Sequence, residues 1–219
     1  RVRENSHWEY DNSRFFDGEV EPCINGLTVG IGAYFGARVD GVVERLLDEQ
    51  LDDGGWNCEA ENGSVCSSFH TTIVVLDGLR EYEHAANGND AVAMARLRGH
   101  EYLLDRHLMR RLSSDEIVNT DWLQFSFPPR WHYDVLRALD YFRTSRTSYD
   151  PRMDEALGLV FSKRGADGRW LLENTHCGSV HLKMEDGDGK PSRWNTLRAL
   201  RVLRWFGWGE AKLAEATPS

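Results

Sequence analysis

Three residues of types that bind zinc stand near the predicted starts of two helices. Glu21 and Cys23 flank the start of one helix, and His70 lies near the start of another, 47 residues after Cys23. A carboxylate, a thiolate and an imidazole can hold zinc and leave a fourth position open for substrate or water. Zinc bound in this way lowers the pKa of a bound thiol or water. Residues of these three types could therefore form a catalytic rather than a structural metal site.

Two of these residues also have a structural interpretation. Cys23 could be a buried, unreactive thiol, and His70 could be a histidine satisfied within the core. Cys58 and Cys66 flank a loop rich in asparagine and glycine, and they either approach the same site or have no part in it. Four cysteines in 219 residues do not indicate a disulfide scaffold.

A second group of polar and aromatic residues stands at the start of a later helix. The candidate catalytic residues are His132, Tyr133 and Asp134, with Asp134 as an acid beside aromatic rings. The candidate substrate-binding residues are Trp131, Trp194, Asn195 and His181. Aromatic faces stabilise cations, although aromatic residues at helical spacing also commonly form a core.

The last predicted helix and the loop before it carry further polar residues. The loop contains His176, Cys177, His181 and Glu185, and it is either a lid or a plain surface loop. The helix carries Arg193, Arg198, Arg201 and Arg204. These guanidinium groups either receive a diphosphate or form salt bridges between helices.

The elements that position these residues are predicted to be helices. Apolar residues recur at helical spacing over residues 22–35, 40–51, 68–84, 90–109, 130–144, 151–163 and 192–207. In the first helix, Leu27, Ile31, Tyr34 and Phe35 share one face. No segment alternates clearly enough to predict a strand.

A repeated phrase separates these helices into pairs. Gly-Gly-Trp at residues 54–56 precedes one helix start, and Gly-Arg-Trp at residues 168–170 precedes another. Repeats at this spacing are typical of helical pairs stacked side by side. The first turns of alternate helices would then converge at one end of the stack, where a site is expected.

With these pairs and the Gln-x-x-x-Gly-Gly-Trp turn of residues 50–56, the chain resembles the α/α toroid of squalene and oxidosqualene cyclases and of protein prenyltransferase β subunits. The resemblance covers most of residues 20–207. In the prenyltransferases an Asp-x-Cys pair opens one inner helix, a His opens the next, and together they bind zinc. Glu21, Cys23 and His70 match that pattern in type, order and approximate separation.

The resemblance implies an all-α fold, in which residues 1–219 form one domain as a partial ring of helical hairpins. It also implies zinc as the cofactor. The chain departs from the family in three ways: Glu replaces Asp in the first motif, the length is too short to close the full ring, and the Asp-x-Asp-Asp acid motif of the cyclases is absent. Asp52 and Asp53 belong to the Gly-Gly turn instead.

The function that this resemblance implies is isoprenoid metabolism, by a relative of prenyltransferases or terpenoid cyclases acting on a small isoprenoid substrate. Two alternatives stay open. One is a non-catalytic α/α toroid that binds a ligand or a protein. The other is a carbohydrate-active α/α-barrel enzyme, which would need facing carboxylates, and the sequence offers no convincing pair.

The net charge of the chain disfavours two classes of binding partner. A formal net charge of −9 disfavours binding to nucleic acid and to an anionic membrane surface. No run approaches 18 apolar residues, so we expect a cytoplasmic protein without a transmembrane segment. The chain opens with Arg1 rather than Met, so an upstream segment, a dimer or a partner subunit is expected to complete the ring.

Overall fold

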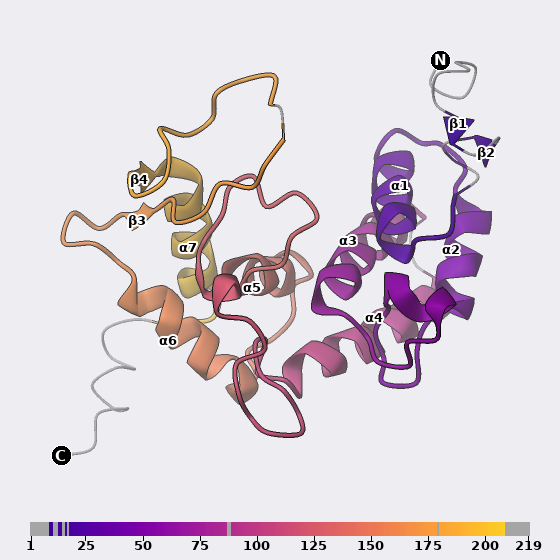
Figure 1. The fold of residues 1–219 in the computed structure, drawn as a ribbon, viewed down its shortest axis with the longest axis horizontal. Helices are drawn as coiled ribbons and strands as arrows, with labels where there is room; N and C mark the ends of the chain where they lie inside the picture. Colours follow the sequence, from indigo (N-terminus) through magenta and orange to yellow (C-terminus); the bar gives the residue numbers. More distant parts are fainter. Residues whose placement is uncertain are drawn as a thin grey trace. The chain divides into compact units, whose positions relative to one another are not determined.

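The computed structural model describes residues 9–10, 13–14, 16, 18–86, 89–178 and 180–208. This part of the chain is mostly helical, as predicted, and contains seven α-helices (Figure 1). It also contains two pairs of two-residue antiparallel strands, which the sequence did not predict. The pairs are β1 (Glu9–Tyr10) with β2 (Ser13–Arg14), and β3 (Trp170–Leu171) with β4 (Pro191–Ser192).

The chain divides into two compact units, Arg1–Leu103 and Leu104–Ser219. The organisation of residues 1–219 as one toroidal domain stays a prediction. Among the described residues, no helix combines the length and the apolar character needed to cross a bilayer.

The first unit is built from two helical pairs. Its helices are α1 (Pro22–Tyr34), α2 (Asp40–Asp48), α3 (Phe69–Ala85) and α4 (Asp90–Leu104), with a short 3-10 helix, η4 (Cys58–Asn62), before α3. Pro22 suits the start of α1 because its fixed φ matches the helix and its missing N–H would have no partner there. Ser68 caps α3 by accepting a hydrogen bond from the backbone N–H of Thr71.

Helices α1 and α3 pack closely because each presents a glycine to the other. A Cβ on Gly26 would lie 2.8 Å from the Cα of Val75, and a Cβ on Gly78 would lie 2.1 Å from the carbonyl oxygen of Gly26. At this contact α1 therefore presents Gly26 rather than a residue with a side chain. The predicted apolar face of α1 is exposed instead, with Tyr34 and Phe35 each 76% accessible.

The Gly-Gly-Trp turn of the first unit anchors α2 to the start of α3. Trp56 is fully buried, and its indole N–H donates to the carbonyl of Leu46 at 2.6 Å. Its backbone N–H donates to the hydroxyl of Thr72 at 3.0 Å. Gly54 has φ +96, a left-handed conformation that glycine adopts without strain.

The second unit repeats this anchor. Its helices are α5 (Val135–Thr144), α6 (Asp154–Ser162) and α7 (Arg193–Trp205), with the 3-10 helices η5 (Thr120–Leu123) and η6 (Pro151–Met153). Trp170 is fully buried and donates to the carbonyl of Val160 at 2.6 Å, and its backbone N–H donates to the hydroxyl of Thr196 at 3.0 Å. The repeated phrase therefore forms the same tryptophan anchor twice.

Several helices are shorter than predicted, among them α6, which spans Asp154–Ser162 rather than residues 151–163 because residues 151–153 form η6. Helix α2 ends at Asp48 rather than at residue 51. Helix α4 ends at Leu104 rather than at residue 109, and the positive φ of His107 and Leu108 is incompatible with a helix that continues to residue 109. Helix α5 begins at Val135 rather than at residue 130, because the buried carboxylate of Asp134 caps it.

We expect Gly78→Ala to lower the free energy of unfolding by about 3 kcal/mol, because the new methyl group would collide with the backbone of α1. Gly41→Ala is the matched control, since Gly41 lies in α2 with open space around its Cβ position. That change should be neutral or stabilising by about 1 kcal/mol. Urea unfolding of both variants measures the difference, and equal stabilities would contradict the close packing of α1 and α3.

His100 on α4 should make the protein sensitive to acid. It is 7% exposed, and burial, with a smaller effect from Arg96, lowers its pKa from 6.5 to about 3. Between pH 6.5 and about pH 3, His100 is protonated in the unfolded chain but neutral in the folded chain. Stability is therefore lost as the pH falls through this window, by about 1.4 kcal/mol per pH unit from this residue. Urea unfolding at several pH values should show a weaker pH dependence for His100→Phe than for the wild type.

Candidate metal centre

Two chain segments of the first unit bring metal-binding side chains together. Glu21 and Cys23 flank Pro22 at the start of α1. Cys58 opens η4, whose start is capped by the Asn57 side chain accepting from the N–H of Glu59. The first turn of α3 lies beside them, because the Thr71 hydroxyl is 3.4 Å from the Cys58 sulfur.

The donor atoms of Glu21, Cys23 and Cys58 all lie within 4.8 Å of one another. The two sulfurs are hydrogen-bonded at 3.1 Å, and the Cys23 thiol donates to the Glu21 carboxylate at 3.5 Å. Glu21 is exposed and both cysteines are partly buried. We call these three residues the Glu-Cys-Cys cluster.

The two thiols of the cluster have divergent acidities. The hydrogen bond with Cys23 stabilises the Cys58 thiolate and lowers the pKa of Cys58 from 9.0 to about 7. The pKa of Cys23 is raised, first by its hydrogen bond with Cys58 and then by burial and the charges of Cys58 and Glu21. The site therefore opposes a second thiolate in the absence of a cation.

His70 is not a member of the Glu-Cys-Cys cluster, although it precedes Thr71 in the same turn of α3. Its role as a zinc ligand stays a prediction. Cys58 takes the third position in this structure, and the sequence analysis left its part in the site open. Its position in the sequence could have indicated this, because Cys58 follows Trp56 by two residues and the buried Trp56 fixes the chain at that point.

A cavity of about 220 Å³ lies against the cluster. Its lining includes Arg45, Pro22, Asn57 and Cys58, so it reaches one of the two sulfurs. A small molecule in this cavity would contact the Cys58 side of the cluster.

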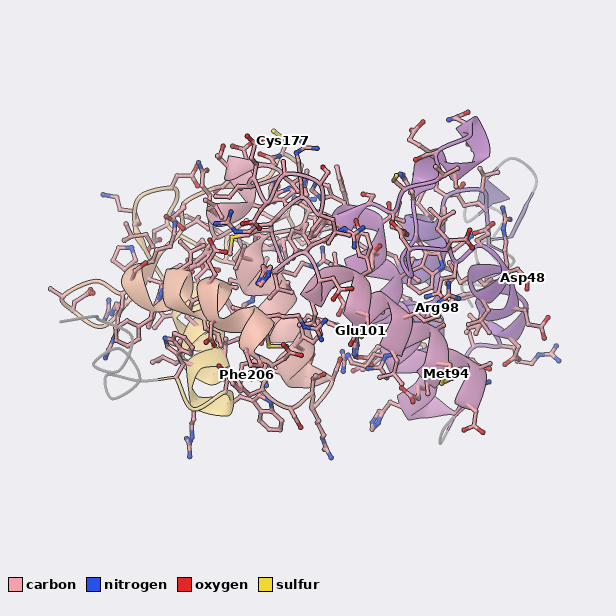
Figure 2. All side chains as sticks on the ribbon, turned by 90° about the horizontal axis from the view of Figure 1, so that it is seen from below. Asp48, Met94, Arg98, Glu101, Cys177 and Phe206 are labelled. Carbon is pink, nitrogen blue, oxygen red and sulfur yellow. The ribbon has the colours of Figure 1, made fainter. Side chains whose placement is uncertain are left out.

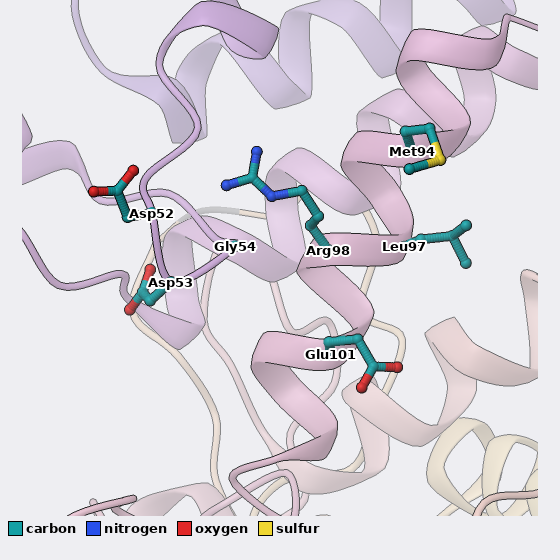
Figure 3. A pocket seen from close by; sticks show the side chains of 7 residues that line it. All are labelled: Asp52, Asp53, Gly54, Met94, Leu97, Arg98 and Glu101. Carbon is teal, nitrogen blue, oxygen red and sulfur yellow. The ribbon is translucent and has the colours of Figure 1, made fainter.

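A second cavity, of about 310 Å³, lies between the Gly-Gly turn and α4 (Figure 3). Arg98 points from α4 toward the turn and donates to the carbonyl of Leu51 at 3.0 Å. The Gln50 side chain crosses the same junction and donates to the carbonyls of Gly54 and Ala95. These bonds give the residues around this cavity a structural role in holding the turn to α4.

In the second unit, Tyr133 and Asp134 are buried and fully engaged with the protein. The Tyr133 hydroxyl donates to the carbonyl of Leu108 at 2.5 Å. Asp134 accepts from the hydroxyl of Ser126 at 2.8 Å and from the backbone N–H of Arg137 at 2.7 Å. These contacts explain both residues as structural, and their catalytic role stays a prediction.

His132 lies in a stack of three rings. Its centroid is 3.8 Å from that of Trp131 and 3.7 Å from that of His176, so the stack joins the chain before α5 to the loop before α7. Burial lowers the pKa of His132, and the neighbouring His176, Arg137 and Arg130 lower it further. Burial also lowers the pKa of His176, although the charge of Asp134 opposes this effect. Both imidazoles therefore favour the neutral form.

The remaining candidate substrate-binding residues lie near α7. Asn195 is fully buried, and its side chain donates to the carbonyls of Phe125 and Leu171. Trp194 stacks on Phe127 with centroids 5.0 Å apart and is 40% exposed. His181 is exposed in the preceding loop. Their part in binding a substrate stays a prediction.

The arginines of α7 differ in environment. Arg198 is buried and bridges to Asp140 of α5 at 3.4 Å, so it forms the inter-helix salt bridge that the sequence left open. Arg201 and Arg204 are exposed.

No protein-family model, no curated protein and no solved structure matches this chain.

If Asp134 is a structural cap rather than a catalytic acid, its replacement should destabilise the fold. Asp134→Ala should lower the free energy of unfolding by about 2 to 4 kcal/mol, because the helix loses its cap and the Ser126 hydroxyl loses its acceptor. Asp121→Ala is a matched control on the exposed side of η5 and should change stability by less than about 0.5 kcal/mol. Thermal and urea unfolding measure both, and an unchanged stability for Asp134→Ala would restore a functional reading of this carboxylate.

Proposed function

We propose that this chain is a zinc-dependent, α/α-toroid enzyme that transfers or rearranges isoprenoid groups, with the Glu-Cys-Cys cluster as its metal site. The observation that carries this proposal is the convergence of Glu21, Cys23 and Cys58 within 4.8 Å at the start of α1. The glycine-mediated packing of inner helices and the repeated tryptophan anchors support the toroid. His70 precedes Thr71 in the first turn of α3, and whether it binds the metal is a separate question.

The donor set of the cluster fits zinc. Two thiolates and one carboxylate match the borderline-soft character of zinc, and three protein ligands leave a position open for a reactant. Two sulfurs bound to a tetrahedral zinc ion at about 2.3 Å lie about 3.8 Å apart. The sulfurs here lie 3.1 Å apart, so they would separate by about 0.7 Å on binding.

An exposed apolar face begins next to the cluster and runs along α1. Ile24, Leu27 and Ile31 are 40%, 44% and 44% exposed, and Tyr34 continues the same helical face. An isoprenoid chain on this face would lie with one end beside Cys23. The burial of its methyl and methylene groups would supply binding free energy, at about 25 cal/mol for each Å² removed from water.

The three residues of the cluster come from two segments of the chain. Glu21 and Cys23 come from one helix start, so their relative positions are fixed by a single turn of α1. Cys58 comes from η4 and is held by the Thr71 hydroxyl. Zinc at this site would supply a Lewis acid that lowers the pKa of a bound thiol or water.

The metal site is tested by elemental mass spectrometry on protein reconstituted with zinc and then desalted. We expect about one zinc ion per chain in the wild type and clearly less retained zinc in Cys23→Ser and Cys58→Ser, because each loses a thiolate ligand. Cys66→Ser is the matched control, with an exposed thiol outside the cluster. His70→Ala decides whether the imidazole also binds. A wild type that retains no zinc would overturn the metal site.

The reaction is tested with zinc-loaded protein, isoprenoid diphosphates of several lengths, and thiol or water as acceptor. Mass spectrometry of the products should show an alkylated acceptor or a terpenoid product that is lost in Cys23→Ser. Leu27→Glu should weaken isoprenoid binding while leaving the zinc content unchanged. Zinc binding without any product would contradict the enzyme and favour a binding scaffold.

A further inference from the structure

We propose that Cys23 and Cys58 are a disulfide-forming pair, and that a peroxide oxidises them to a reversible disulfide that no longer binds the metal. The disulfide rests on the positions of the two sulfurs alone. Its consequence for zinc also rests on the proposed function.

The distance between the two sulfurs is longer than that in a disulfide and shorter than that between two zinc-bound sulfurs. They lie 3.1 Å apart, whereas a disulfide bond is about 2.05 Å long and two zinc-bound sulfurs are about 3.8 Å apart. Displacements of about 1 Å or less therefore reach either arrangement. Both residues are free thiols in this structure, and they belong to segments 35 residues apart in sequence.

The pair is reachable by a small oxidant. Cys58 lines the cavity of about 220 Å³ beside the start of α1, and Cys23 is only partly buried. A peroxide is small enough to enter a space of this size. Cys66 and Cys177 are both exposed, and Figure 2 labels Cys177 on the loop before α7.

The chemistry balances with hydrogen peroxide as the oxidant. One thiolate of the pair attacks a peroxide oxygen, the O–O bond breaks, and the products are a sulfenic acid and hydroxide, which takes up a proton to become water. The second thiolate attacks the sulfenic sulfur, an S–S bond forms, and a second hydroxide leaves and becomes water. Two thiols are oxidised and one peroxide is reduced to two waters. A dithiol such as dithiothreitol reverses the oxidation by thiol–disulfide exchange.

The disulfide would remove the metal site because neither sulfur of an S–S bond carries the negative charge that a zinc ligand needs. It would also link the start of α1 to η4 covalently. The same two residues would then hold zinc when reduced and link two segments when oxidised.

The test uses the full chain with Cys66→Ser and Cys177→Ser, which leaves only the pair. After treatment of the metal-free protein with one equivalent of hydrogen peroxide, intact mass spectrometry should show the loss of two hydrogen atoms. A non-reducing peptide map should show Cys23 joined to Cys58, and dithiothreitol should restore the starting mass. Adding Cys58→Ser to this background is the control and should give no cross-link, with circular dichroism confirming that it folds.

The outcomes separate the disulfide from the metal site. A cross-link in a protein that never binds zinc would support the disulfide and overturn the proposed metal site. Zinc binding with slower cross-linking of the zinc-loaded protein than of the metal-free protein would support both. Sulfinic acid on either residue without a cross-link, or a cross-link only between two chains, would overturn the disulfide.

Discussion

The close contact between α1 and α3 is the constraint on which the candidate site depends. Gly26 and Gly78 lie where the two helices meet, and a Cβ on Gly78 would be 2.1 Å from the backbone of α1. Because no side chain separates the helices there, their backbones come into direct contact. Cys23 in the first turn of α1 lies 3.1 Å from Cys58, which in turn contacts Thr71 in the first turn of α3. A larger residue at either glycine would move the ligands as well as weaken the packing.

The two tryptophan anchors show how one sequence phrase builds the same local structure twice. Trp56 and Trp170 are both fully buried, and both donate to a carbonyl ten residues earlier at 2.6 Å. Each also donates its backbone N–H to a threonine in the following helix at 3.0 Å. A buried indole N–H without a partner would cost free energy, so the bond fixes how the helix before the turn meets the helix after it. The segments after the two anchors differ, and the Glu-Cys-Cys cluster uses the shorter one.

Burial separates the residues that hold the fold from those that remain available for chemistry. Tyr133, Asp134 and Asn195 have polar groups of the kind found in catalytic sites, but in this structure their hydrogen bonds go to the backbone and to a buried serine. Glu21, Cys23 and Cys58 are exposed or partly buried, and their donor atoms face one another. The sequence could not make this distinction, because residue type and helical position are the same for a cap as for a catalytic acid.

The sequence by itself determined the helical class, the approximate positions of the seven helices, the repeated turn and two residues of the cluster, Glu21 and Cys23. These features are local, because helical periodicity, proline at a helix start and glycine in a turn depend on neighbouring residues. Only the tertiary structure decided that Cys58 joins the cluster, that the apolar face of α1 is exposed, and that His132 stacks between Trp131 and His176. Each of these depends on contacts between segments far apart in sequence, and helical spacing carries no information about how closely two helices approach. The glycines at the α1–α3 contact set that approach.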